Sequence, residues 1–201
     1  MIGDCEKERK GIMHIIEAIR EKCRRKHWYG PEDFKWTQAA LVGRPSFEQG
    51  FGYSPATPEQ LLSTEQALGF PLPPLLRALY FELANGGFGP GAGLRGAIGG
   101  FGAPGTFQNG NDETLVKYHL RGSESLIDQP LFQHVPQVLL PSNRWPRLLA
   151  PLCDLGCAVE VCIDANGQLY RLGPTEENFV SALRPWQPLE QWLHNWLAGA
   201  G

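Results

Sequence analysis

The sequence lacks long hydrophobic runs and is poor in charged residues. No stretch approaches the roughly 18 consecutive apolar residues of a membrane-spanning helix. The opening MIGDCEKERK is charged where a secretory signal would turn apolar. We therefore expect no membrane insertion and a cytoplasmic location. Only 19% of the residues are charged, whereas 42% are hydrophobic. Intrinsic disorder is excluded, because such a chain can bury enough apolar surface to offset the entropy lost on ordering.

Cysteine is also sparse. Five cysteines are an odd number and too few for a disulfide scaffold in a chain of 201 residues. Cys153, Cys157 and Cys162 lie close together, but no histidine follows them at zinc-finger spacing. We expect reduced, buried thiols and no metal site.

Catalytic motifs are missing as well. The five histidines are scattered, none lies in an HExxH pattern, and no serine lies in a GxSxG pattern. Residues Gly91 to Gly96 match GxGxxG, but a dinucleotide site needs a strand before the motif and a helix after it. Here a helical pattern precedes it and more glycines follow. We predict a non-enzymatic protein without a cofactor. A pocket formed by the glycine-rich turn with Asp112 or His119 remains an alternative.

Neither sign of charge dominates, but the charge is unevenly spread. Residues 1–27 hold eight basic and five acidic side chains, and the remaining residues hold 10 basic and 16 acidic ones. The body of the chain therefore carries −6. An acidic body disfavours nonspecific binding to nucleic acid, whose phosphates attract cations. It is compatible with a basic protein partner.

The N-terminal region contains an amphipathic helix, predicted from Lys10 to Lys26, with isoleucines at helical spacing on one face. Its basic end suits the dipole at a helix C-terminus, although it could also contact nucleic acid or an anionic membrane. Prolines and glycines then break regular structure between Tyr29 and Pro55. We divide the chain into an extension, residues 1–54, and a main domain, residues 55–201.

Two short helices are predicted at the start of the main domain. Thr57 is placed as the N-cap of the first, Gln60 completes a capping box, and Gly69 is placed as the C-cap. The second follows a cluster of prolines at 71–74 and shows leucines at helical spacing. Asn85-Gly86 can take the left-handed conformation that ends a helix.

Glycine dominates the next stretch, from Gly86 to Gly105. We expect tight turns there, with residues 94–98 as the one candidate for a short strand. A third helix is predicted to begin at Asn111 or Asp112 and to continue to about Leu120.

A strand and hairpin are predicted nearer the C-terminus. Apolar residues Val159, Val161 and Ile163 alternate with Glu160, Cys162 and Asp164, as in a half-buried strand. Asn166-Gly167 is a hairpin turn signal, and the return strand covers residues 168–172. We expect Gly173-Pro174 to end that strand and a loop containing Pro185 to follow. Pro188 then opens a last helix with the apolar stripe Leu189, Trp192, Leu193, Trp196 and Leu197.

The order of these motifs resembles the SUKH superfamily, which contains bacterial toxin-immunity proteins and fungal cell-wall assembly regulators. The likeness spans about residues 55–198 and includes Leu68-Gly69, Leu72-Pro73, the run from Leu83 to Gly91 and the segment from Cys153 to Ala158. The long N-terminal extension departs from the pattern. We interpret the matching residues as fold-specifying rather than chemical: Gly69, Pro73, Asn85, Gly86, Gly87, Phe88, Gly89, Pro90, Gly156 and Trp192.

The resemblance implies an α+β domain with an antiparallel or mixed sheet packed against helices, here with an extra N-terminal amphipathic helix. It also implies a protein partner, and in bacterial relatives that partner is a toxin, often a nuclease, which the immunity protein neutralises by direct binding. The alternative is a regulatory scaffold like the fungal relatives, with the basic helix as a docking element. The resemblance brings no catalytic residues.

Candidate partner contacts are acidic or aromatic side chains outside the apolar stripes. They are Glu160, Glu176, Glu177 and Trp186. Glu160 is chosen because the alternation places it on the face opposite Val159 and Val161. We expect the face that carries Glu160 to be exposed to solvent. Trp186 is chosen because aromatic side chains in irregular segments either anchor loops or serve as binding hot spots.

Overall fold

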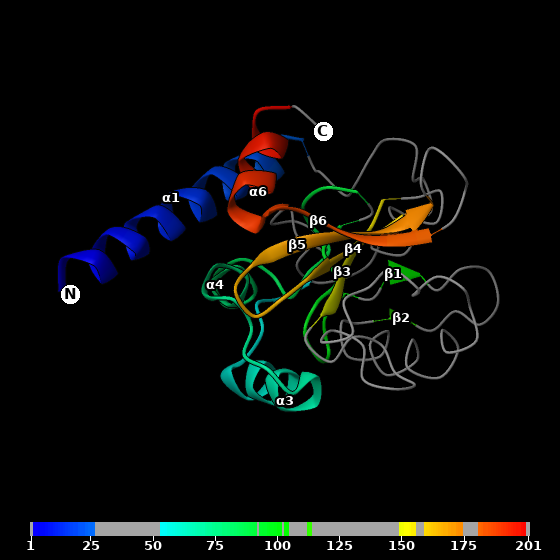
Figure 1. Cartoon of the computed structure of the whole chain (residues 1–201). Coiled ribbons are helices and arrows are strands. Elements are labelled where there is room, and N and C mark those ends of the chain that lie inside the picture. Colours follow the sequence, from blue (N-terminus) through cyan, green and yellow to red (C-terminus); the bar gives the residue numbers. More distant parts are fainter. Residues whose placement is uncertain are drawn as a thin grey trace.

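The computed structural model describes residues 2–26, 53–91, 93–101, 103–104, 112–113, 149–155, 159–174 and 181–199. Helices pack on an antiparallel sheet in this part of the chain (Figure 1), which confirms the predicted α+β class. The helices are α1 (Ile2–Lys26), α3 (Pro58–Leu68), α4 (Pro74–Glu82) and α6 (Leu189–Leu197). Strands β1 (Ala103–Pro104) and β2 (Asp112–Glu113) pair with each other, whereas β3 (Ala150–Asp154), β4 (Glu160–Ile163), β5 (Gln168–Pro174) and β6 (Ser181–Pro188) form a four-stranded sheet.

The four-stranded sheet is a meander in the order β3-β4-β5-β6, with each neighbouring pair antiparallel. The predicted hairpin turn at Asn166-Gly167 is confirmed. Gly167 has a φ of 82°, and its N–H donates to the carbonyl oxygen of Asp164 at 3.1 Å. The Asp164 carboxylate closes the turn further, because it accepts from the backbone N–H groups of Asn166 and Gln168 at 2.9 Å each.

The predicted loop before the last helix is wrong, because β6 occupies residues 181–188 and leads directly into α6. β5 also continues through Gly173-Pro174 instead of ending there. A proline has no N–H to donate to a neighbouring strand, so within a sheet it is found mainly on edge strands, where one side needs no partner. β6 is such an edge strand, and its pairing with β5 is irregular where Pro185 and Pro188 lie opposite Tyr170 and Gln168.

The main hydrophobic core lies between one face of this sheet and the helices. Val161, Ile163 and Leu169 belong to one buried cluster with side chains of α1, α3, α4 and α6. On the opposite face of the sheet, Cys162 packs with Leu149 and with partly buried neighbours from β5. All four residues of β4 are buried, so the predicted half-buried strand is buried on both faces.

The caps predicted for α3 are confirmed. The Thr57 hydroxyl accepts from the Gln60 N–H at 3.3 Å, and the Gln60 side chain accepts from the Thr57 N–H at 2.8 Å. Gly69 ends the helix in the left-handed conformation, with a φ of 78°. α4 begins at the prolines as predicted, with Pro73 as its N-cap. It ends at Glu82, before Asn85-Gly86, so that pair shapes the following turn instead of capping the helix.

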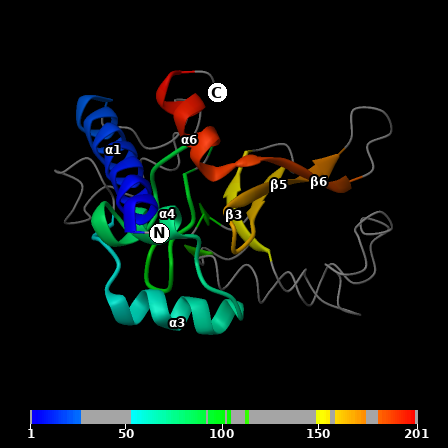
Figure 2. The same ribbon diagram turned by 60° about the vertical axis from the view of Figure 1, so that its left-hand side comes forward.

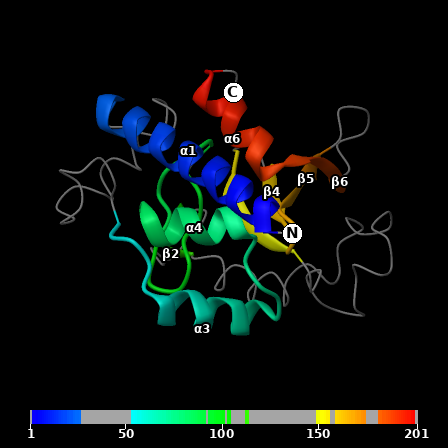
Figure 3. The ribbon, with the colours of Figure 1, turned by 90° about the vertical axis from the view of Figure 1, so that its left-hand side faces the viewer.

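Helix α1 is longer than predicted and belongs to the core. It starts at Ile2, and its side chains Ile15, Ile16, Ile19 and Cys23 are 0–1% exposed. α1 contacts both α4 and α6; Figure 3 shows it lying across α4, and Figure 1 shows α6 at its C-terminal half. α3 lies on the far side of α4 from α1 (Figure 2).

The basic end of α1 holds the ends of two other helices. Arg20 donates to the carbonyl oxygen of Glu82, the last residue of α4, at 3.1 Å. Lys22 donates to the carbonyl oxygen of Trp196 near the end of α6 at 2.5 Å, and its ammonium lies 4.5 Å from the centre of the Trp196 ring. Cations at helix C-termini are favoured by the unsatisfied carbonyl groups there.

Two further predictions are corrected. Residues 94–98 form no strand, although the N–H of Arg95 donates to the carbonyl oxygen of Leu152 in β3 at 2.8 Å. The predicted start of a third helix falls on β2, in which Asp112 and Glu113 pair with Pro104 and Ala103. The remainder of that prediction, residues 114–120, lies outside the described residues.

Candidate functional site

The glycine-rich corner, residues 86–91 and 93–101, is packed against itself. Gly86 has a φ of 84°, and a Cβ built on it would lie 2.6 Å from the backbone nitrogen of Gly96. A Cβ on Gly96 would lie 2.2 Å from the carbonyl oxygen of Asn85. Side chains are therefore excluded because neighbouring backbone already fills the space. The glycines serve close packing within the chain.

Other motif residues support this corner. The Asn85 side chain accepts from the Ala97 N–H at 2.7 Å, and its backbone carbonyl accepts from the Phe101 N–H at 2.8 Å. Gly87 and Gly89 have φ values of 80° and 97°, and Phe88 between them is 1% exposed. The carbonyl oxygen of Pro90 accepts from the thiol of Cys153 in β3 at 3.1 Å. These contacts tie the corner to the sheet.

A buried ion pair joins the corner to β4. Arg95 and Glu160 are 2% and 8% exposed, and the guanidinium contacts both carboxylate oxygens, one through Nη1 and the other through Nη2 at 3.1 Å. The hydroxyl of buried Tyr80 in α4 donates to the carbonyl oxygen of Arg95. The prediction that Glu160 faces solvent is therefore wrong, because a cation 65 residues away in the chain neutralises it inside the protein.

Burial governs the titration of this pair. Burial raises the pKa of Glu160 to about 7, and the lowering effect of Arg95 is smaller. The role of Glu160 is thus to connect the corner to the sheet, and its selection as a partner contact loses its basis. The sequence did hold a signal: Arg95 is the one charged residue between Asn85 and Gly105, and a charge in a buried segment requires a partner.

Trp186 lies on a different surface, at the edge strand β6. Its side chain is 36% exposed and meets the buried Trp192 of α6 in an edge-to-face contact, with ring centres 5.6 Å apart. The guanidinium of Arg171 in β5 lies 5.3 Å from the centre of the Trp186 ring. Arg171 is paired directly across the strands with Arg184 of β6, and both are exposed. We call Arg171, Arg184 and Trp186 the Arg–Trp surface.

Neutral polar groups lie beside the Arg–Trp surface. Asn195 of α6 donates to the side-chain oxygen of Gln187 at 3.0 Å and accepts from Gln191 at 2.9 Å. A partly exposed aromatic side chain, held by a buried one and flanked by arginines and amides, has the anatomy of a protein-binding hot spot with a polar rim. Reasoning from the sequence found Trp186 but missed both arginines, because β6 was not predicted.

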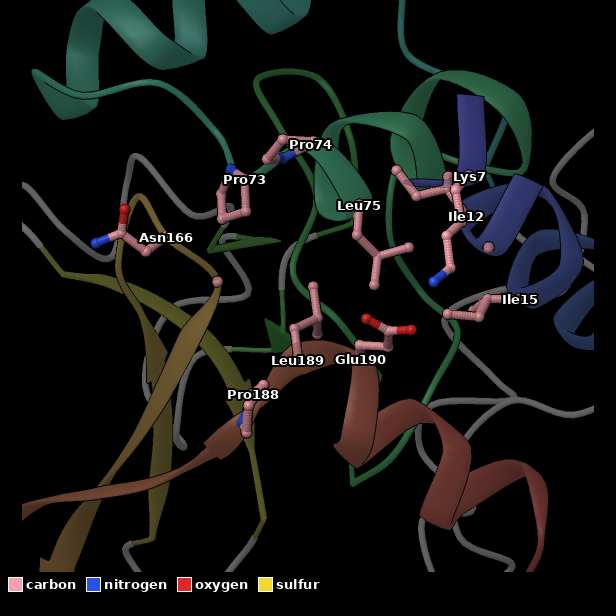
Figure 4. Close-up of a pocket in the computed structure, with 12 residues that line it drawn as sticks. Lys7, Ile12, Ile15, Pro73, Pro74, Leu75, Asn166, Pro188, Leu189 and Glu190 are labelled. Atoms are coloured by element: carbon pink, nitrogen blue, oxygen red, sulfur yellow. The ribbon is translucent and has the colours of Figure 1, made fainter. Parts of the chain in front are cut away.

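A groove lies between the N-terminal part of α1, from Lys7 to Ile15, and the main domain. It has a volume of about 510 Å³ and runs between α1, the start of α4, the β4–β5 turn and the start of α6 (Figure 4). Lys7 and Glu190 point toward one another from opposite sides (Figure 4). The remaining lining is largely apolar and includes Ile12, Ile15, Pro73, Leu75, Pro188 and Leu189. The sequence could not reveal this groove, because it depends on where α1 docks.

The described thiols fit the sequence interpretation. Cys23, Cys153 and Cys162 are free and buried. Burial raises the pKa of Cys23 to about 12 and also raises that of Cys162, so both thiols stay protonated. Within the part of the chain that the structure covers, no three His, Cys, Asp or Glu side chains gather as a metal site would require. Cys157 lies outside that part.

Several predicted positions lie outside the described residues: Glu176, Glu177 and Gly156, together with His119 of the alternative pocket. Trp192 is 5% exposed in the core.

Among the helices described, none is both long enough and apolar enough to cross a membrane.

Comparison with known proteins gives one match. The family model described as SMI1 / KNR4 family (SUKH-1) matches residues 55–195. No curated protein and no solved structure matches the chain. The matched segment contains the glycine-rich corner, the four-stranded sheet and nearly all of α6, and α1 precedes it.

Proposed function

Because the chain belongs to the SMI1/KNR4 family (SUKH-1), we propose that it binds another protein in the cytoplasm, as an immunity protein that covers and neutralises a cognate nuclease toxin. Membership of the family supports a SUKH-type role in protein binding or immunity. The proposal involves no catalysis by this chain. The glycine-rich corner, the most conspicuous motif of the sequence, serves packing and hydrogen bonding within the fold.

The observation that carries the proposal is the exposed face of Trp186. A tryptophan that is 36% exposed leaves apolar area in water. Its contacts with Trp192 and Arg171 restrain the ring, so less side-chain entropy is lost on binding. Tryptophan and arginine are enriched among the residues that dominate protein interfaces.

Co-expression with a candidate toxin encoded beside the gene for this chain tests the proposal. The wild-type chain should restore growth and should co-elute with the toxin in size-exclusion chromatography. Trp186→Ala should abolish rescue while still melting cooperatively above the growth temperature, although the loss of its contact with Trp192 lowers the melting temperature. The matched control is Leu62→Ala in α3, which removes a side chain that is 54% exposed and should leave rescue intact. Absence of both rescue and complex would refute the immunity role.

The alternative is a regulatory scaffold, in which the basic end of α1 would dock onto a partner. Arg20 and Lys22 instead bind the ends of α4 and α6 within the same chain. This use of the basic side chains favours the immunity proposal over docking through α1. A scaffold would give no rescue in the toxin experiment and would leave Trp186→Ala without effect on growth.

A further inference from the structure

We infer that the Arg–Trp surface recognises an acidic protein surface, in which carboxylates lie beside an apolar group. This inference deepens the proposed function by naming the chemistry of the partner. It differs from the reading of the net charge of the chain, which is compatible with a basic partner. The local charge at the edge of the sheet is opposite to that of the body, which carries −6 over residues 28–201.

The first argument is the pairing of like charges. Arg171 and Arg184 are directly opposite each other on adjacent antiparallel strands, where Cβ atoms are roughly 5 Å apart and like charges destabilise the sheet. Both side chains are exposed. Among the ion pairs between described residues, none involves either arginine. The fold thus tolerates a repulsion that a carboxylate of a partner would relieve.

The second argument is geometric. The pairing of β5 with β6 is irregular between Gln168 and Tyr170, opposite the segment from Pro185 to Pro188 that contains Trp186. Such irregularities re-aim side chains at the edges of sheets. Trp186 and Arg171 then lie side by side, with a guanidinium-to-ring distance of 5.3 Å. The surface therefore presents an aromatic ring next to the guanidinium groups of Arg171 and Arg184. A guanidinium group can bind a carboxylate through two parallel N–H donors.

The chemistry selects a protein over a nucleic acid. Arginine and tryptophan also bind nucleic acids, but that affinity depends on a broad positive field that neutralises many phosphates. The body of this chain is acidic. Two arginines beside one tryptophan suit a small acidic site with an apolar neighbour. Carboxylates that hold divalent metal ions in nucleases form acidic sites of this kind.

The test first uses probes that do not depend on the identity of the toxin. Poly-L-glutamate, poly-L-lysine and a single-stranded DNA oligonucleotide are titrated into the full-length chain, and the indole N–H resonance of Trp186 is followed by NMR after its assignment with Trp186→Phe. Poly-L-glutamate should shift this resonance, high salt should suppress the shift, and poly-L-lysine should leave it unmoved. The double variant R171Q/R184Q should lose the shift, whereas the exposed control Arg24→Gln in α1 should keep it.

The thermal stability of the double variant R171Q/R184Q tells whether the two arginines serve binding or support the fold. The melting temperature of R171Q/R184Q should equal or exceed that of wild type, because a repulsion is removed. A marked fall in melting temperature would show that the arginines support the fold and would overturn the inference. The inference also fails if poly-L-glutamate leaves Trp186 unmoved, if the double variant responds equally, or if DNA produces the stronger response.

Failure of the inference can be told apart from failure of the proposed function. If wild type binds the toxin, the charge reversal R171E/R184E should weaken binding by about 100-fold or more, as expected for two interface hot spots. If R171E/R184E binds the toxin as tightly as wild type, the acidic-partner inference is refuted, but the immunity role is not. A response to poly-L-glutamate without any toxin binding supports recognition of an acidic surface and refutes the immunity role.

Discussion

At the scale of single residues, Glu160 joins two distant parts of the chain inside the protein. Its carboxylate is 8% exposed and is held by Arg95 from the glycine-rich corner. Glu160→Lys would place two cations together in the interior. Breaking a buried pair costs about 3–5 kcal/mol, so we expect at least that loss of unfolding free energy in urea denaturation. The control Glu6→Lys disturbs only an exposed pair on α1 and should change stability by less than about 1 kcal/mol. Equal behaviour of the two variants would contradict the burial of Glu160.

The same carboxylate predicts a pH dependence. Burial raises the pKa of Glu160 from its ordinary value of 4.5 to about 7. Between these values the folded state holds a proton that the unfolded chain releases, so the contribution of Glu160 is fully present below pH 4.5 and is lost as the pH rises through 7. Relative to the non-titrating Glu160→Gln, wild type should lose up to about 3 kcal/mol of unfolding free energy over this range. Urea denaturation at several pH values measures the difference. A constant difference would show that Arg95, and not burial, sets the pKa.

Glu160 also shows where reasoning from the sequence stops at this scale. Alternation with Val161 and Ile163 correctly placed Glu160 on the face opposite the main core. It could not show that this second face is buried too, because Leu149 packs on Cys162 there and the neutralising cation is Arg95. Contacts at long sequence separation leave no periodic signal.

At the scale of elements, glycines of opposite character allow a paired test. Gly86 has a φ of 84° and no room for a Cβ, so Gly86→Ala should lose about 3 kcal/mol or more from strain and backbone contact. Gly11 lies inside α1 with nothing within 4 Å of a built Cβ. Gly11→Ala should therefore gain about 0.5–1 kcal/mol, because alanine is the better helix former. Thermal melts of both variants beside wild type provide the measurement. Tolerance of alanine at Gly86 would contradict the close backbone packing of the corner.

The elements that the sequence predicted well are those with local signals. The capping box at Thr57, the left-handed Gly69 and the hairpin turn at Gly167 each depend on residues close together in the chain. β6 was missed because Pro185 and Pro188 contradict a central strand, and the sequence does not tell that β6 lies at an edge. The candidate site was only partly predictable for the same reason. Trp186 was chosen for its residue type, whereas Arg171 and Arg184 become neighbours only through the pairing of β5 with β6.

At the scale of the whole molecule, α1 is part of the same body as the family domain. The family match begins at residue 55, yet Ile15, Ile16, Ile19 and Cys23 of α1 belong to the core cluster that contains Val161 and Trp192. The isoleucines at helical spacing predicted an amphipathic helix here. Its partners, α4 and α6, follow from the three-dimensional arrangement alone. The division of the chain at residue 54 therefore separates sequence segments that share one core.

A shared core predicts that the family domain is weakened without α1. Each fully buried aliphatic side chain contributes about 1.5–3 kcal/mol, so deleting residues 1–26 removes several kcal/mol from a total that is commonly 5–15 kcal/mol. It also exposes the surface of α4 and α6 that α1 contacts. We expect the truncated chain to melt far below wild type or to aggregate, and Ile16→Asp in the full chain to behave similarly. Met13→Ala is the matched control, because Met13 is 38% exposed on the same helix, and it should melt like wild type. A truncated chain as stable as wild type would mean that α1 is an appendage and that the core is complete without it.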